Sequence, residues 1–384
     1  MKIDKKWWAL ALLLFLPIAP LSAQEGVGDE SQDRVWSPRV TGAPSLLITP
    51  DATSAGLGET GLLAAQGAFA LMHNMSLLPF SEETWGVSLS FTPWMPDLSR
   101  DTNLSTLLGY YSIDGASGLR HSVAAGVRYF SVGQTLAFPK SQRAVLETRP
   151  YELSVDLGYG LRILPSLSMG VGLRYFVSDY NISQSGVSSL AQTVMGDLSL
   201  TYRQPVSIER LSTELTAAVA IRNIGGKISH DGGLSYLYSP AALDFGVGVR
   251  LHLTESDELS LLISGDKLMV PQYPTTGQGG GSLDEQRKAY YKLSLWEAIG
   301  ESWSDPDAWR DLSCSVGLQY AYKGRAFGRV GYRHQSPDAG PGAGLSLGGG
   351  FRYEMVQLDL AYFVAQDSKS PLNNTLRVTL STDF

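Results

Sequence analysis

The strongest constraint on the fold of this chain is an alternation of side-chain character with a period of two residues. From Leu312 to Tyr322, the large apolar side chains stand at even positions, and the odd positions hold small or polar residues. Successive side chains of a β-strand point to opposite faces, so this pattern predicts a strand with one apolar face and one small, polar face. The same alternation recurs along most of the chain after Trp85.

The alternation predicts fourteen strands, an even number, as a single-chain bacterial outer-membrane barrel requires. They cover residues 85–91, 103–112, 120–132, 151–162, 167–177, 192–203, 214–223, 241–253, 258–267, 311–322, 326–334, 345–353, 356–363 and 375–384. Most are long enough to cross a bilayer when tilted, and a closed barrel leaves no strand edge unpaired in lipid. We therefore expect an all-β fold, a 14-stranded antiparallel transmembrane β-barrel over residues 85–384. A soluble β-sandwich also alternates, but its strands average about 5 to 6 residues.

The connections between the predicted strands alternate between short and long. The short ones are 163–166, 254–257, 323–325 and 354–355, and the longest runs from about Leu268 to Arg310. Outer-membrane barrels have short periplasmic turns and longer extracellular loops, so both termini are expected in the periplasm. Tyr, Phe or Trp residues end many of the strands, which suits the aromatic girdles of such barrels.

The charges on the minor faces of the strands mix both signs, and this favours a filled, rigid barrel interior over an ion-selective pore. The residues expected to face the lumen are Arg128, Asp156, Arg162, Arg174, Asp197, Asp244, Arg250, Asp266, Arg352, Asp359 and Arg377.

The N-terminal part of the chain differs from the rest. Residues 1–23 have the form of a secretory signal peptide, with Lys2, Lys5 and Lys6 before an apolar run and a small-residue cleavage site ending at Ala23. Residues 24–43 are polar and predict a flexible periplasmic leader. Residues 44–84 are Gly-rich and then mildly helical from about Glu59 to Met72, and we expect them to form an N-terminal plug segment.

Composition excludes several functions. The single cysteine, Cys314, rules out a disulfide framework and a Cys-based zinc site, and a net charge of −7 with no basic run argues against nucleic acid. The five histidines are scattered, with no H-E-x-x-H motif, so neither a metal nor a cofactor is expected.

One catalytic motif occurs, because Gly344 to Gly348 matches the G-x-S-x-G nucleophile elbow around Ser346. That motif needs a strained turn from a strand into a helix, whereas the alternation here continues through Tyr353 as a strand. We therefore expect a protein that is not an enzyme. A surface esterase would need an activity that depends on Ser346.

Aromatic residues in two outer loops are the candidate binding residues. The long connection has a Gly-rich, flexible start from Tyr273 to Gly281, and residues Leu283 to Ile299 have helical spacing. Exposed tryptophan and tyrosine rings either pack as a lid over the barrel mouth or meet a protein partner, and the two roles are compatible. The candidates are Pro93, Trp94, Met95, Tyr290, Trp296, Trp303 and Trp309.

Several stretches resemble one known family. These stretches are similar to the PorV family, the outer-membrane barrels of the type IX secretion system in Bacteroidetes. They are Pro44–Ala52 with the following Gly56–Gly61, Ser90–Met95, Asn223–Ser229, and the end of the chain from Gly328–Tyr332 to Asn374–Val378. The resemblance spans nearly the whole mature chain. Where the family tends to have Trp-Asn-Pro-Ala, this chain has His73-Asn74-Met75-Ser76, so only Asn74 agrees.

The resemblance implies a FadL-like barrel with a plug and a role in secretion. Implied partners are the C-terminal domains of secreted cargo, the large translocon barrel, the cell-surface sortase complex, and the lipid and lipopolysaccharide of the outer membrane. The leading hypothesis is a cargo shuttle that works without covalent chemistry. The alternative is a FadL-type transporter of hydrophobic small molecules, with the Gly-rich stretch Gly56–Gly67 as a ligand gate.

Overall fold

The computed structural model describes residues 39–384 except 98, 100, 116–117, 134, 138–145, 181–188, 209–210, 276–281, 305–307, 337–339 and 341. The predicted signal peptide, most of the leader and most of the Gly-rich stretch before Leu283 lie outside the described residues. None of the helices in the described part is long and apolar enough to cross a membrane.

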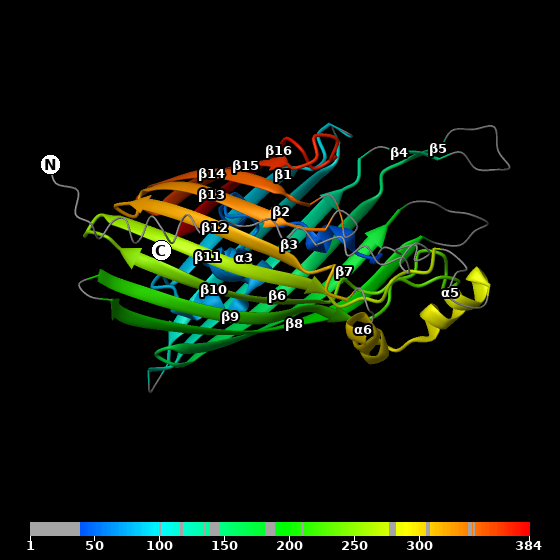
Figure 1. The fold of residues 1–384 in the computed structure, drawn as a ribbon, viewed down its shortest axis with the longest axis horizontal. Coiled ribbons are helices and arrows are strands. Elements are labelled where there is room, and N and C mark those ends of the chain that lie inside the picture. Colours follow the sequence, from blue (N-terminus) through cyan, green and yellow to red (C-terminus); the bar gives the residue numbers. More distant parts are fainter. Residues whose placement is uncertain are drawn as a thin grey trace, which may run out of the picture.

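The chain forms a closed antiparallel β-barrel of fourteen strands, as the alternation predicts (Figure 1). The barrel strands are β1 (Trp85–Pro93), β2 (Asn103–Asp114), β3 (Arg120–Ser131), β6 (Tyr151–Leu164), β7 (Leu167–Asp179), β8 (Leu190–Ile208), β9 (Leu211–Gly225), β10 (Ala242–His252), β11 (Asp257–Leu268), β12 (Ser313–Tyr322), β13 (Ala326–His334), β14 (Gly344–Tyr353), β15 (Val356–Ala365) and β16 (Thr375–Asp383). Each strand pairs with its neighbours, and β1 closes the barrel by pairing with β16, with Phe91 opposite Val378. The short hairpin of β4 (Thr135–Ala137) and β5 (Leu146–Thr148) in the β3–β6 connection was not predicted.

The apolar faces of the strands point outward and the polar faces point into the lumen. In β15, exposure alternates along all ten residues, so that Leu358 is 46% exposed and the next residue, Asp359, is 1% exposed. This is the arrangement of a barrel surrounded by lipid, with exposed apolar side chains on the outside and buried Ser, Asp and Arg on the inside.

The lumen charges pair with one another, as the mixture of signs predicts. Arg329 Nη1 lies 2.6 Å from Asp359 Oδ1, and Arg174 pairs with Asp156. Because the Arg329 and Arg174 guanidinium groups are each matched by a carboxylate on a nearby strand, these pairs hold strands together inside the barrel.

Residues 44–80, here called the inner segment, form a run of short helices inside the barrel (Figure 1). They are η1 (Pro44–Leu47), α2 (Ala52–Gly56), α3 (Gly61–Ala64), η2 (Gly67–Phe69), α4 (Ala70–His73) and η3 (Met75–Phe80). The Asp51 side chain begins α2 by accepting a 2.7 Å hydrogen bond from the Ser54 amide. The helical stretch expected from Glu59 to Met72 is interrupted, because Gly67 takes a left-handed conformation with φ of 51°.

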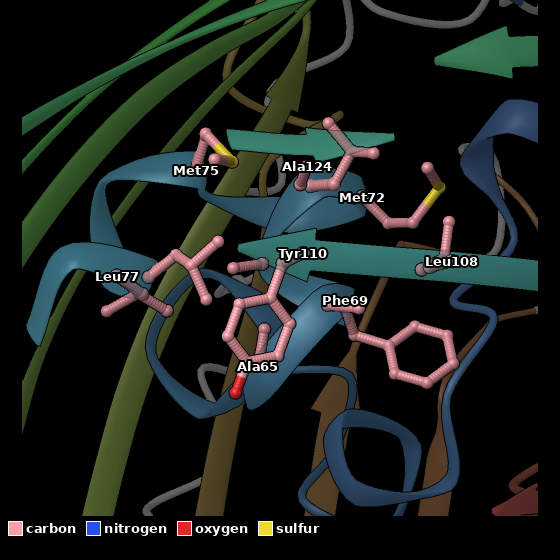
Figure 2. Close-up of a cluster of buried hydrophobic side chains, with 12 residues drawn as sticks. Ala65, Phe69, Met72, Met75, Leu77, Leu108, Tyr110 and Ala124 are labelled. Atoms are coloured by element: carbon pink, nitrogen blue, oxygen red, sulfur yellow. The ribbon is translucent and has the colours of Figure 1, made fainter. Parts of the chain in front are cut away.

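The main hydrophobic core lies between the inner segment and the inside of the barrel wall. Phe69, Met72 and Leu77 of the inner segment meet Leu108 and Tyr110 of β2 (Figure 2). The core of this barrel is therefore in its lumen, and the inner segment supplies most of the apolar side chains that fill it.

Candidate functional site

The candidate binding residues all lie at one end of the barrel, here called the crown. The crown is the end opposite Trp85 and Phe384, where β1 leads into β2 and β11 into β12. Pro93, Trp94 and Met95 belong to the β1–β2 connection, and the other four candidates belong to the β11–β12 connection.

The Trp94 side chain packs into the barrel mouth. It is half-buried against a cluster of Ile48 from the inner segment with Leu104 and Phe130 from the wall. The Arg377 guanidinium lies 5.8 Å from the centroid of the Trp94 ring, within the range of a cation–π contact. Met95 turns the chain at φ of 51°, and the Trp94 amide donates to the Thr102 carbonyl at 2.9 Å. Trp94 therefore joins the inner segment to the rim of the barrel.

The β11–β12 connection carries two helices, α5 (Leu283–Lys292) and α6 (Leu295–Ser304). Each begins with a capping box. Ser282 and Glu285 exchange hydrogen bonds of 2.8 and 3.3 Å, and Ser294 and Glu297 exchange bonds of 2.7 and 3.3 Å. The helical stretch expected from Leu283 to Ile299 is thus divided in two, because Ser294 caps a second helix.

A cluster of tyrosines fixes these helices to the β9–β10 connection. The Tyr238 hydroxyl donates to the carbonyls of Tyr290 and Leu293 at 2.9 and 3.0 Å. The Tyr290 ring is buried edge-on between Tyr238 and Tyr273, with centroids 5.1 and 5.2 Å away. Burial raises the pKa of Tyr238 to about 12 and the pKa of Tyr290 further still. Tyr290 is therefore a packing residue of the loop.

The residues against which this loop packs were not predicted from the sequence. Tyr238 and Val270 pack with Tyr290 and Ala298, and the Lys227 ammonium donates to the Tyr291 carbonyl at 2.6 Å. Tyr238 is 52 residues from Tyr290 and Lys227 is 64 residues from Tyr291, and no local periodicity indicates such pairs.

Three tryptophans of the same connection stay wholly or partly exposed. Trp296 is 70% exposed and Trp309 is 65% exposed, while Trp303 is half-buried. Trp303 meets Trp309 edge to face at 5.5 Å between centroids, and its ring lies 5.0 Å from the Lys267 ammonium.

A cavity of about 300 Å³ lies between the inner segment and the crown. Its apolar lining includes Leu46, Leu47 and Ile48, and its charged lining consists largely of pairs. These pairs are Arg222–Asp244 at 2.5 Å, Arg333–Asp266 at 2.7 Å, Arg377–Glu59 at 2.9 Å, and Arg39–Asp311.

Arg128 differs from the other arginines that line the cavity. It is 3% exposed, and its nearest polar contacts are the Ser45 carbonyl and the Met72 sulfur, each at 3.3 Å. Within the described ranges, no carboxylate forms an ion pair with Arg128. The cavity thus combines an apolar floor with one cation that lacks an ionic partner.

Ser346 has the setting of a barrel residue. It lies within β14, which runs without interruption from Gly344 to Tyr353, and its side chain faces the lumen and is buried. The strand expected from the alternation is confirmed, and the strand-to-helix turn of a nucleophile elbow does not occur at this position. Among the described residues, no group of three or more His, Cys, Asp or Glu side chains is arranged to hold a metal ion.

The chain is similar to several solved structures. They include the toluene transporter TodX of Pseudomonas putida, with 12% identity over 91% of this chain and 99% of that chain and a TM-score of 0.49. They also include the Ralstonia pickettii toluene transporter TbuX, with 12% identity, 87% and 98% coverage and a TM-score of 0.44. A FadL homologue of Pseudomonas aeruginosa has 10% identity, 88% and 99% coverage and a TM-score of 0.44. No curated protein sequence matches the chain.

The sequence also matches a family model, described as type IX secretion system protein PorV, over residues 30–275. This match covers more than half of the chain and includes the inner segment and the first nine strands of the barrel, β1 to β11. The chain therefore belongs to the PorV family, and it is an outer-membrane β-barrel of the type IX secretion system.

Proposed function

We propose that this protein binds the C-terminal domains of secreted cargo at its crown as they leave the large translocon barrel, and that it delivers them to the cell-surface sortase and attachment complex. The crown would then face the cell exterior, with both termini in the periplasm. The short turns at the opposite end and the export signal support this orientation.

The observation that carries the proposal is the construction of the β11–β12 connection. Two capped helices are held by the Tyr238–Tyr290 cluster on top of a barrel wall, so the loop is ordered before any partner arrives. A preordered surface loses little conformational entropy on binding, which favours recognition of a folded partner. The loop lies beyond the family-matched range, so its part in cargo binding rests on this geometry.

Capture requires no covalent chemistry from the barrel. The candidate binding residues differ in how far their side chains are exposed. They are Pro93, Trp94, Met95, Tyr290, Trp296, Trp303 and Trp309. Trp94 and Tyr290 are packed and support the surface from below, while the exposed residues of the β11–β12 connection form its surface.

The test is to replace residues 283–309 by a short Gly-Ser linker and to measure co-purification of cargo with the barrel. We expect cargo to be lost while the barrel still shows the heat-dependent gel shift of a folded outer-membrane protein. A matched control replaces the exposed crown residues Asp367 to Lys369 in the β15–β16 connection and should keep its cargo. Full cargo retention by the 283–309 variant would refute the assignment.

A second candidate function is the passage of hydrophobic small molecules, and the cavity above the inner segment is the observation in its favour. The cavity has apolar walls from Leu46, Leu47 and Ile48 next to Arg128, which could receive an amphipathic ligand. If cells that lack the protein lose surface-anchored cargo but take up hydrophobic compounds at the normal rate, transport fails as its function.

A further inference from the structure

The segment after α6 folds over the outer surface of the barrel wall. On β11, Leu261 and Ile263 point outward and are exposed, and Lys267 stands on the same face four residues further along. Yet Lys267 is fully buried, with its ammonium 5.0 Å from the Trp303 ring. Because Trp303 covers an outward-facing residue, this part of the loop lies on the lipid side of the rim. In Figure 1, α6 lies at the margin of the barrel, beside the crown ends of the strands.

The α6 helix is amphipathic. At 3.6 residues per turn, Leu295, Trp296, Ile299 and Trp303 fall along one side, and Glu297, Glu301 and Ser304 fall along the other. Between these two sides, Ala298 and Ser302 are buried. The small residues attach the helix to the protein. The apolar side is only partly covered among the described residues, because Trp296 is 70% exposed and Leu295, Ile299 and Trp303 are half-buried.

The apolar side of α6 continues the outward-facing apolar band of the barrel. Leu243 of β10 is paired directly with Lys267, and the next outward residues of β10, Phe245 and Val247, are exposed at 43% and 55%. Trp309 stands close to the start of β12, where the Leu312 amide donates to its carbonyl at 3.2 Å. The exposed tryptophans thus stand at the upper edge of the surface that the barrel presents to acyl chains.

We propose that α6, with Trp296, Trp303 and Trp309, is an interfacial membrane anchor that lies in the headgroup region of the leaflet at the crown. Tryptophan is the side chain favoured at membrane–water interfaces, and helices with one apolar aromatic face lie in the plane of that interface. The two glutamates of α6 provide no attraction to anionic headgroups, so burial of apolar area holds the helix and its seating is independent of salt.

With this anchor, the two helices of the loop have different roles. The α6 helix fixes the base of the loop at the height of the bilayer surface, and α5, joined to it through Leu293 and Ser294, is held above it by the tyrosine cluster. This inference does not depend on the proposed function, because lipid alone is the partner.

The test places a fluorophore next to the apolar side of α6. Gly300 stands one turn after Trp296, and a Cβ at this position would meet nothing within 4 Å, so a cysteine there accepts a label without a clash. In a Cys314→Ser background, the Gly300→Cys protein is labelled with a bimane and reconstituted into vesicles that contain no other protein. The exposed Ala289 of α5, changed to cysteine, is the matched aqueous control. The natural Cys314, which is exposed on the outward face of β12, is the lipid-facing reference.

We expect brominated phospholipids to quench the label at position 300 at least threefold more strongly than the label at 289, and to a degree near that at 314. The quenching should be the same in 0.1 and 1 M salt. Equal quenching at 300 and 289 would overturn the proposal and would leave a protein partner as the occupant of this face.

A second variant tests the tryptophans themselves. Trp296→Ser combined with Trp309→Ser should lower the quenching at position 300 at least twofold while the barrel keeps its heat-dependent gel shift. Because both side chains are exposed, their loss does not disturb a core. Unchanged quenching would overturn their role as anchors. The vesicles contain no cargo protein, so this quenching reports on the lipid contact alone and is independent of cargo capture.

Discussion

Gly331 of β13 lies against Gly58 of the inner segment so closely that a Cβ atom on Gly331 would come within 2.0 Å of the Gly58 amide nitrogen. Gly58 itself has a φ of 71°, a conformation that L side chains rarely adopt. The inner segment is therefore seated on the barrel wall backbone to backbone, through two glycines that come from distant parts of the chain.

A side chain at this contact should displace the inner segment. We expect Gly331→Val to lower the free energy of unfolding by about 1–3 kcal/mol, as overpacked cores do, and to expose the segment to protease. Thermal unfolding in detergent and limited proteolysis measure the two effects. Gly328→Val is the matched control, because a Cβ on Gly328 meets nothing within 4 Å. Equal behaviour of the two variants would contradict the close seating.

Removing one partner of a buried lumen ion pair should be costly. Asp359→Asn leaves the Arg329 guanidinium, which lies 2.6 Å from the carboxylate and is buried, without its counter-charge. The expected loss is about 3–5 kcal/mol in the free energy of unfolding, measured by denaturant titration in vesicles. Glu258→Gln, which breaks the half-exposed pair with His252, should cost less than about 1 kcal/mol. Losses of equal size in the two variants would contradict a structural role for the lumen pairs.

Replacing Arg128 should not lower the free energy of unfolding, in contrast to replacing Asp359. Because it is buried without a carboxylate partner in the described part of the chain, Arg128→Met removes a desolvated charge at similar side-chain volume. We expect the free energy of unfolding to stay equal or to rise, in the same denaturant titration. A clear destabilisation would show that the guanidinium has an anionic partner in the folded protein.

The Tyr238 hydroxyl should hold the α5–α6 loop in place. Tyr238→Phe removes the donor to the carbonyls of Tyr290 and Leu293, at about 0.5–1.5 kcal/mol for each hydrogen bond. Hydrogen exchange of residues 283–304 should then accelerate, while exchange in β10 and β11 stays unchanged. Tyr236→Phe in the same connection is the matched control. Unchanged exchange in both variants would mean that apolar packing alone fixes the loop.

The β9–β10 connection should loosen in mild acid. Burial lowers the pKa of His230 below its ordinary value of about 6.5, although the Asp231 and Asp179 carboxylates act to raise it. The folded protein therefore prefers the neutral ring, which stacks on Tyr180 with centroids 4.2 Å apart and lies 2.6 Å from the Ser178 hydroxyl.

This contribution to stability is fully present above about pH 6.5 and decreases as the pH falls toward the lowered pKa of His230. We expect hydrogen exchange of residues 226–241, corrected for the intrinsic effect of pH, to be faster at pH 5 than at pH 7. The His230→Gln variant should lose this difference. A difference that persists in the variant would assign the pH dependence to another group.

The barrel could be predicted from the sequence because lipid outside and a polar inner face impose a period of two on the strands. The alternation fails as a guide where that contrast ends. The last five residues of β8, Gln204–Ile208, continue the ladder opposite residues 211–215 but were not predicted, because Gln204 and Pro205 interrupt the alternation and a proline argues against a strand.

The details of the crown depend on contacts between distant segments. Trp94 meets Ile48 and Phe130, and Tyr290 meets Tyr238, and nothing in the local sequence indicates these partners. The helical spacing did predict helices after Leu283, but not the exposure of each ring, because burial depends on what the rest of the fold places beside it. The pattern alone could not distinguish the packed Tyr290 from the exposed Trp296.

The most direct test of the account is the location of type IX cargo in cells that lack this protein. We predict that cargo disappears from the cell surface, accumulates in the periplasm, and returns to the surface when the intact chain is supplied, but not when the 283–309 variant is supplied. Normal surface cargo in the deletion strain would contradict the central claim.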